Sequence, residues 1–545
     1  MAQEAIQKSR VIVWFRDDLR LHDNPTVHAA ATKVKTKQAA EVVPVYCFDP
    51  RHFGTTPYGS KKTGDYRAKF LLESVQDLKQ NLKSIGSDLL IHMGRPEDAL
   101  AELANVEQKT TILLQTQITS EELNVEAKVK RAVKGKAQCE SVWGHTLYHP
   151  EDVPYKLDMS DLPDTFTPAR HKIEQHAQVR AALPTPQQGE LPLPEGLPKA
   201  MLECNPQAVE DLNAVVPKGS QQLSTQELNE HAVHRFTGGE SEALARLKYY
   251  LWDTDLLASY FQTRNGMLGG DYSTKFSPWL AHGNLSARTI YHEIKKYESE
   301  RKANKSTYWV IFELLWRDYF RFFTQKHGNK LFAEYGITGK KLRWSEDPQA
   351  FQRWKDGQTG LPLVDANMRE LKQTGFMSNR GRQNVASYLV LDMGVDWRKG
   401  ADWFETVLQD YDVCSNWGNW VAAAGLTGGR INHFNITKQS KDYDLEGEYV
   451  KTWIPELKDV SSKRIHEPWL MSQSEQQQFG VSIGQDYPAP IPSSQLVRPH
   501  GSPEGGRNPG GGRGRGRGGK RGHGRGGRQN DRHRTQPRGE YERFG

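Results

Sequence analysis

Short apolar runs alternate with helical patterns over the first 145 residues of the chain. Runs rich in β-branched and aromatic residues lie at 11–15, 42–48, 88–93 and 110–116. Such runs are typical of parallel strands that are covered on both faces. Apolar residues recur at helical spacing between the second and third runs, at Phe70, Leu71, Val75, Leu78 and Leu82. The alternation predicts an open α/β sheet of the nucleotide-binding type.

Two turns of this predicted sheet region bear on its helices and on its ligand. Thr119 and Glu122 have the spacing of a capping box and predict the start of a further helix. No Gly-x-Gly-x-x-Gly follows the first apolar run, so the dinucleotide fingerprint is missing. An NAD-dependent dehydrogenase is therefore disfavoured.

The pattern changes twice further along the chain. Residues 183–230 are rich in Pro, Gln and Gly, which favours an extended, solvated connector. Beyond Gly239 helical periodicity continues to about 457, and from Gly501 Arg-Gly repeats leave almost nothing to bury, which predicts disorder. We expect a Rossmann-like sheet domain at 10–150, a linker at 151–238, an all-helical domain at 239–460, an extended segment at 461–500 and a disordered tail at 501–545.

Composition and charge narrow the class of protein. No run approaches the roughly 18 apolar residues that a membrane span needs, and the start lacks a secretory signal. An intracellular location follows, in the nucleus or cytoplasm, with an organelle left open. The four cysteines form no CxxC pair, so we expect them to be reduced thiols. Residues 501–545 hold eleven Arg and one Lys against four acidic residues, a net +8, whereas the whole chain sums to +7. The rest of the chain is thus near −1, and overall charge does not show that it binds nucleic acid.

Two segments of the predicted helical domain combine polar and aromatic groups. Hydroxyls and a lysine at Ser273–Ser277 precede Pro278 at a predicted helix start, which suits a diphosphate, although ordinary capping explains the hydroxyls as well. Trp309, Glu313, Trp316 and Arg317 fall on one helical face. A carboxylate beside flat rings suits a stacked base, whereas a buried Glu313–Arg317 ion pair is the structural alternative.

Two later segments extend the pattern. Asn379–Asn384 gathers amides and guanidiniums at a helix start, which suits phosphate or a flavin edge but also fits a basic, solvated turn. Asp410 and Asp412 precede Asn416, Trp417 and Trp420 within eleven residues. A metal site is disfavoured here because no histidine cluster accompanies the aspartates.

The order of these segments resembles the photolyase and cryptochrome superfamily from about residue 10 to 457. Trp14–Arg20, with Asp23 and Asn24, is similar to the opening signature of that family. Val142–His149, Glu313–Phe320 and Cys414–Trp420 are most similar to the DASH cryptochromes. The resemblance implies an α/β photolyase domain followed by an all-helical FAD-binding domain.

The resemblance also implies roles for particular residues. Those expected around FAD and its phosphates are Tyr260, Ser273, Thr274, Lys275, Phe276, Ser277, Arg317, Arg382, Asp410, Asp412 and Asn416. Those expected at the lesion pocket and its rim are Glu313, Trp316, Asn379, Arg380 and Gln383. An electron-hopping chain of Trp344, Trp397 and Trp420 is implied as well. No metal is expected.

The implied reaction is blue-light repair of a flipped cyclobutane pyrimidine dimer by electron transfer from reduced flavin. Two departures bear on it. Gln383 replaces the methionine of conventional dimer photolyases, as is usual in the DASH group. Ala422 replaces an aromatic residue that generally walls the DASH pocket, which removes a stacking surface typically worth ~1–3 kcal/mol per base. Single-stranded DNA is therefore the expected substrate.

Further partners follow from the same resemblance and from the tail. A folate antenna, 5,10-methenyltetrahydrofolate, is implied between the two domains. The Arg-Gly repeats suit contact with RNA or DNA, against the alternative of a solubilising tail. We expect a monomer that does not associate with a membrane. A light-sensing or RNA-associated regulator, whose flavin chemistry signals without repair, is the alternative function.

Overall fold

The computed structural model describes residues 9–491 and confirms the α/β sheet followed by helices. Five parallel strands lie in the order β3-β2-β1-β4-β5. Their bounds are β1 Ser9–Phe15, β2 Glu41–Phe48, β3 Leu90–Met93, β4 Lys109–Gln115 and β5 Ala137–Val142. The first four coincide with the apolar runs. Strand β5 is not predicted, because this edge strand is half-buried and its sequence, AQCESV, has no apolar run.

Helices cover both faces of this sheet. Their bounds are α1 Pro25–Lys35, α2 Asp65–Ser84, α3 Pro96–Leu103 and α4 Ser120–Ala132. Residues of α1 and α2 share a buried cluster with Val11 and Val13 of β1, whereas residues of α3 and α4 pack with Ile12 and Trp14 on the opposite face. Helix α4 begins where predicted, but the Thr119 hydroxyl bonds the Glu122 carboxylate and caps no backbone amide.

The connecting segment packs more closely than its composition predicts. It holds α5 Phe166–His176, α6 Lys199–Leu202 and a 3-10 turn at Val209–Val215. Leu191, Leu212 and Leu223 are buried in the cluster beneath α2. The chain is largely extended and mostly exposed or half-buried here, and its scattered leucines anchor it to the sheet domain.

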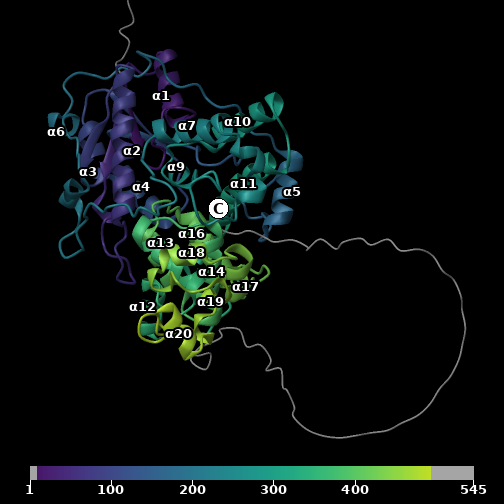
Figure 1. Ribbon diagram of the computed structural model, residues 1–545. Coiled ribbons are helices and arrows are strands. Elements are labelled where there is room, and N and C mark those ends of the chain that lie inside the picture. Colours follow the sequence, from purple (N-terminus) through teal and green to yellow (C-terminus); the bar gives the residue numbers. More distant parts are fainter. Residues whose placement is uncertain (1–8, 492–545) are drawn as a thin grey trace, which may run out of the picture.

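The remaining described residues form helices, and Figure 1 shows them beside the purple-to-blue sheet region, from teal α7 to yellow α20. Their bounds are α7 Glu240–Lys248, α8 Tyr260–Thr263, α9 Ser277–Ala281, α10 Ala287–Glu300, α11 Lys305–His327, α12 Pro348–Asp356, α13 Pro362–Thr374, α14 Asn379–Ser387, α15 Trp397–Val407, α16 Val413–Ala423, α17 Ile436–Tyr443, α18 Glu448–Trp453, α19 Ser462–Ile465 and α20 Gln473–Phe479. One large buried cluster runs through them. No helix within residues 9–491 is long and apolar enough to cross a membrane.

The sheet region and the helices are joined by buried polar contacts. Glu240 at the start of α7 accepts from the backbone amides of Leu21 and His22, at 2.7 Å each. Asp23 pairs with Arg288 of α10 at 2.5 Å. These contacts fix the carboxyl ends of the strands against the helical part.

Candidate functional site

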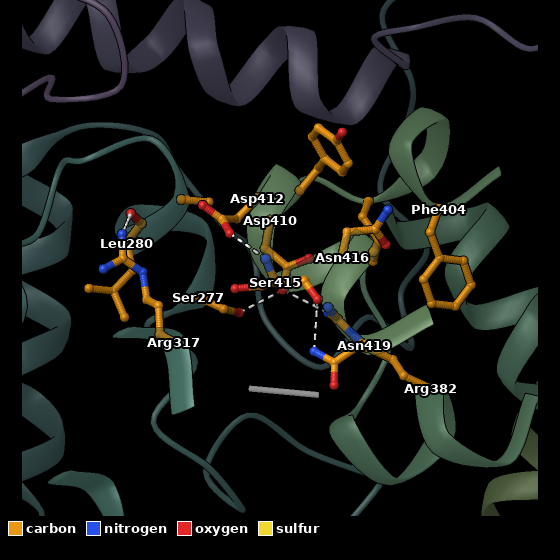
Figure 2. A pocket seen from close by; sticks show the side chains of 13 residues that line it. Ser277, Leu280, Arg317, Arg382, Phe404, Asp410, Asp412, Ser415, Asn416 and Asn419 are labelled. Carbon is orange, nitrogen blue, oxygen red and sulfur yellow. Dashed lines mark hydrogen bonds and ion pairs between the residues drawn. The ribbon is translucent and has the colours of Figure 1, made fainter. Parts of the chain in front are cut away.

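Asp410 joins three separate segments of the helical part. The hydroxyl of Ser277, which opens α9, donates to Asp410 Oδ2 at 2.7 Å. A guanidinium nitrogen of Arg382 on α14 lies 2.7 Å from the same oxygen. Pro278 occupies the first turn of α9, as predicted. Figure 2 shows these side chains converging below the start of α16.

One face of α16 supplies the next polar groups. Asp412 caps the helix by accepting from the Ser415 amide at 2.7 Å. The Asn416 amide donates to the carbonyl of Ala401 on α15 at 3.0 Å, and Asn419 Nδ2 donates to the carbonyl of Ser415 at 2.8 Å. Because these positions are three or four residues apart, they share a helix face.

Arg317 on α11 closes the opposite side of this site. Its guanidinium donates to the carbonyls of His145 and, at 3.2 Å, Leu280. The side chain thereby connects α11 to the loop after β5 and to α9. No ion pair between Glu313 and Arg317 is needed to hold it.

These groups line an inner cavity of about 60 Å³. The lining residues are Ser277, Leu280, Ala281, Arg317, Arg382, Phe404, Leu408, Asp410, Tyr411, Asp412, Ser415, Asn416 and Asn419. Six of them are predicted flavin residues. Sequence reasoning missed the other seven, although Asn419 follows Asn416 at helical spacing. Since sites for ligands usually enclose about 300–1,000 Å³, this cavity can hold only part of a dinucleotide.

The donors and acceptors of the inner cavity fit a flavin. Asp410 Oδ1 and Asn419 Oδ1 are buried and have no hydrogen-bond partner among residues 9–491. Guanidinium and amide donors lie in the same lining. A flavin ring has both carbonyl acceptors and an N–H donor on one edge. Buried acceptors without partners are what the N–H donor of such a ligand satisfies.

The segment before Ser277 lies apart from the inner cavity. Arg246 of α7 holds it, donating to the carbonyls of Thr274 at 3.0 Å and Ser273 at 3.3 Å. Lys275 Nζ lies 3.2 Å from Ser273 Oγ and 3.0 Å from the ring centre of Tyr272. Burial lowers the pKa of Lys275 well below its usual value. Phe276 is a core residue, 3% exposed. A phosphate role for this segment stays a prediction.

Glu313 and Tyr260 meet near the predicted lesion pocket. The Tyr260 hydroxyl of α8 donates to the Glu313 carboxylate of α11. Trp316, one turn further on, stacks on Phe166 of α5 with ring centres 3.7 Å apart. Its indole Nε1 is buried without an acceptor in the described part of the chain.

The start of α14 brings the remaining predicted pocket residues together. Arg380 donates to Gln383 Oε1 at 2.9 Å and to Asn265 Oδ1 at 3.1 Å. Its guanidinium also lies 4.5 Å from the ring centre of Tyr443. Asn379 Oδ1 is buried and has no partner within residues 9–491. The amide of Asn379 is therefore available to a ligand.

Of the three predicted redox tryptophans, Trp397 opens α15, Trp420 lies on α16, and Trp344 lies in the loop before α12. Trp420 and Trp397 are fully buried, and Trp344 is half-buried. A Cβ at Gly400, one turn after Trp397, would lie 2.4 Å from the Trp420 ring, so α15 touches that indole. Ser345, next to Trp344, forms a backbone bridge with Val395. The use of these three indoles as an electron-hopping chain stays a prediction.

A second, larger cavity of about 670 Å³ lies between the sheet region and the helices. Its charged and aromatic lining includes Arg16, Asp17, Asp49, Arg51, Glu121, Glu122, Glu405, Tyr411 and Trp417. Many of these follow the carboxyl ends of β1 and β2, where open α/β sheets bind ligands. Sequence reasoning expected a ligand between the domains but assigned no residues to it. Tyr411 and Asp412 line both cavities.

Comparisons with known proteins agree with this geometry. Residues 309–499 match the family described as FAD binding domain of DNA photolyase, and residues 11–188 match the DNA photolyase family. A chloroplastic/mitochondrial cryptochrome DASH of Ostreococcus tauri is 50% identical over 537 residues, which is 92% of this chain and 94% of that protein. Cryptochrome DASH of Gloeobacter violaceus is 48% identical over 484 residues, 88% of this chain and 92% of that protein.

Solved structures show the same architecture. The cryptochrome of Synechocystis sp. PCC6803 superposes with a TM-score of 0.81 at 47% identity, covering 88% of this chain and 96% of that one. A class III photolyase of Agrobacterium tumefaciens gives 0.73 at 26% identity, covering 90% and 96%. The chain therefore belongs to the photolyase/cryptochrome family, within it to the cryptochrome DASH group, and FAD is its cofactor.

Proposed function

We propose that the protein is a blue-light-driven photolyase that splits cyclobutane pyrimidine dimers, chiefly in single-stranded DNA. The placement of two side chains on α11 carries the proposal. Arg317 lines the inner cavity, and Glu313 lies one turn before it, which is about 6 Å along the helix axis. A lesion held by Glu313 would therefore lie next to a flavin bound at the inner cavity.

The protein's part in repair is to bind and polarise the flipped lesion. When bound, reduced FAD supplies under blue light the electron that opens the dimer, and it recovers that electron afterwards. The Tyr260 hydroxyl donates to Glu313 and helps to position its carboxyl group, and a protonated Glu313 would donate to a base carbonyl of the lesion. The Asn379 amide offers a second polar contact. A preorganised donor such as protonated Glu313 would stabilise the negative charge that develops on the lesion.

Arg380 orients the far side of the pocket. It is 4% exposed, and its bonds to Gln383 and Asn265 fix both amides. Gln383 can therefore present a defined donor to the lesion where conventional enzymes have a methionine. Trp316 keeps one face against Phe166, which holds the indole in place.

An aromatic ledge supports single-stranded DNA as the partner. We define the ledge as Phe261, Trp309 and Phe312, whose adjacent ring centres are 4.7 Å and 4.5 Å apart. Lys305 Nζ lies 3.4 Å from the ring centre of Phe261. Half-exposed rings beside a cation suit stacked, unpaired bases and their phosphates. The ledge is one helical turn from Glu313 on α11.

The repair proposal is tested with purified, reduced protein and dimer-containing oligonucleotides. Blue light should remove dimers from single strands in the wild type, and Glu313→Ala should remove most of this activity. Glu300→Ala, at the exposed last residue of α10, serves as the control. If wild-type protein with bound flavin leaves the dimers intact, repair is not its function.

The indole series supports light-driven reduction of the flavin through the protein. In the proposed chain the electron passes from Trp344 through Trp397 to Trp420, and indoles are among the most readily oxidised side chains. Each step moves one electron inward. Trp420→Phe should slow this photoreduction, and dark chemical reduction of the same variant should be unchanged.

We further propose that the large cavity holds 5,10-methenyltetrahydrofolate as an antenna. Its volume, about 670 Å³, is within the range of sites for molecules of this size. Its polar lining offers both charges, and it shares Tyr411 with the inner cavity. An additional near-ultraviolet absorption band that disappears when the folate is removed tests this assignment.

A photoreceptor function without repair is the second candidate. Ala422 favours it, because a buried methyl group on α16 replaces the ring that would stack on a lesion. The predicted RNA contact belongs to the Arg-Gly tail, which lies outside the described residues. This candidate requires photoreduction through Trp420 while single-stranded dimers persist under light.

A further inference from the structure

A second aromatic path leaves the predicted electron chain at its middle member. The ring centres of Trp397 and Trp417 are 5.8 Å apart, with the rings at 80°. Trp417 lies on α16 and lines the large cavity. Its indole Nε1 donates to the hydroxyl of Tyr411 at 3.2 Å. Trp397 therefore has an oxidisable neighbour that leads away from Trp344.

Tyr411 ends this path with a base for its proton. Its hydroxyl donates to Glu405 Oε2 at 2.9 Å. Glu405 lies on α15, two turns after Trp397, and is 8% exposed. The order of donors is thus Trp417 N–H to Tyr411 O–H to the Glu405 carboxylate. A phenol loses an electron readily only if its proton leaves as well, so this hydrogen bond is the requirement for oxidation.

Burial and neighbouring charges shift the pKa of the Glu405 carboxyl group. Burial raises the pKa of Glu405 to about 7, against the opposing effects of Arg67 on α2, Lys62 before α2 and the Tyr411 hydrogen bond. Glu121 at the start of α4 raises it further. Arg67 also lies 4.7 Å from the ring centre of Tyr411. The proton acceptor therefore changes state near neutral pH.

We infer that Trp417, Tyr411 and Glu405 form a second electron-transfer branch, in which Tyr411 reduces oxidised Trp397 and passes its phenolic proton to Glu405. The inference rests on the proposed function, because photoexcited oxidised flavin is the oxidant that draws an electron from Trp397 through Trp420. One electron moves from Tyr411 through Trp417 to Trp397, so both indoles end neutral. The Tyr411 O–H bond breaks, an O–H bond forms on Glu405, and a neutral tyrosyl radical remains beside the large cavity.

Time-resolved absorption and electron paramagnetic resonance of the flavoprotein test this branch. After a blue flash, the wild type should show a tryptophanyl signal followed by a tyrosyl signal. Protein grown with ring-deuterated tyrosine should show the later spectrum narrowed. Tyr411→Phe should abolish the tyrosyl signal, and Trp417→Phe should delay it. Glu405→Gln should slow tyrosyl formation by about 10²-fold, since its amide cannot accept the proton.

Matched controls separate this branch from a general loss of structure. Tyr58→Phe changes another tyrosine at the large cavity that has no part in the relay, and it should leave the tyrosyl signal intact. Trp344→Phe blocks the surface branch and should increase the tyrosyl yield. In the wild type, raising the pH through about 7 should increase that yield as Glu405 ionises, and Glu405→Gln should abolish the dependence.

Two failures have different meanings. If a tryptophanyl signal forms and decays without a tyrosyl signal, or if the tyrosyl signal persists in Tyr411→Phe, the branch is overturned while the electron chain of the proposed function stands. If no tryptophanyl signal forms in flavin-loaded protein, the electron chain itself is wrong, and this branch falls with it.

Discussion

Arg382 and Asp410 form an ion pair of 2.7 Å at the wall of the inner cavity, and the Asp410 side chain is 1% exposed. The pair joins α14 to the segment before α16, and Ser277 of α9 completes it. Three elements that are far apart in the sequence therefore depend on one carboxylate. Because Asp410 Oδ1 still lacks a partner within residues 9–491, the same group is positioned to bind the flavin.

Asp410→Asn should therefore release the flavin and destabilise the protein. Removing one partner of a buried ion pair typically costs about 3–5 kcal/mol, because the other charge stays buried. The flavin-to-protein absorbance ratio and chemical denaturation measure the two effects. Asp152→Asn breaks the exposed pair with Arg180 and should change stability by about 1 kcal/mol or less. Equal effects of the two substitutions would show that Asp410 has no special role.

Tyr260→Phe should reduce repair while leaving flavin content unchanged. Loss of a hydrogen bond to a neutral carboxyl group costs about 0.5–1.5 kcal/mol, which corresponds to roughly twofold to tenfold in rate. Dimer loss per absorbed photon is the measurement. Tyr249→Phe, which changes an exposed tyrosine of the same domain, is the control substitution. An unchanged repair yield in Tyr260→Phe would separate Tyr260 from the lesion pocket.

Gly400→Ala should disturb the electron chain without touching an indole. The added Cβ would lie 2.4 Å from the Trp420 ring, so either α15 or the ring must move. Overpacking of this kind costs about 1–3 kcal/mol. Flash photolysis should show slower photoreduction, and Gly54→Ala, where the nearest atom is 3.9 Å away, should not. Normal kinetics in Gly400→Ala would argue against contact between α15 and Trp420.

Glu370 should make stability depend on pH. Burial raises its pKa from 4.5 to about 7, against a hydrogen bond from Tyr449 of 2.5 Å. Since the folded state holds this proton more tightly than the unfolded chain, the contribution is full below about pH 4.5 and is lost as the pH rises through about 7. Denaturation at several pH values should show a flatter profile for Glu370→Gln. A profile that matches the wild type would contradict this.

The sequence predicts the sheet well because its central strands are continuous apolar runs, buried on both faces. It misses β5, whose half-exposed position needs no such run. In the connector, the high proline content predicts an extended chain but does not indicate that its leucines pack on the sheet domain. The hydrophobic pattern of a segment therefore indicates how deeply an element is buried. It does not indicate which distant segment covers that element.

The same limit applies to the site. Asp412, Asn416 and Asn419 share a helix face, so periodicity alone can group them. The contact of Tyr411 with Glu405, by contrast, depends on how α15 turns back toward α16, and the large cavity depends on β1 meeting helices about 400 residues later. Such groupings follow from tertiary packing, which residue spacing does not encode.

In the proposed function, Glu313 presents a lesion to flavin held at the inner cavity. The most direct test is light-dependent loss of cyclobutane dimers from a single-stranded oligonucleotide, with reduced, flavin-loaded wild type and Glu313→Gln compared at equal flavin content. We expect repair by the wild type and a large loss of repair in the variant. Equal repair by both proteins, or none by the wild type, would contradict it.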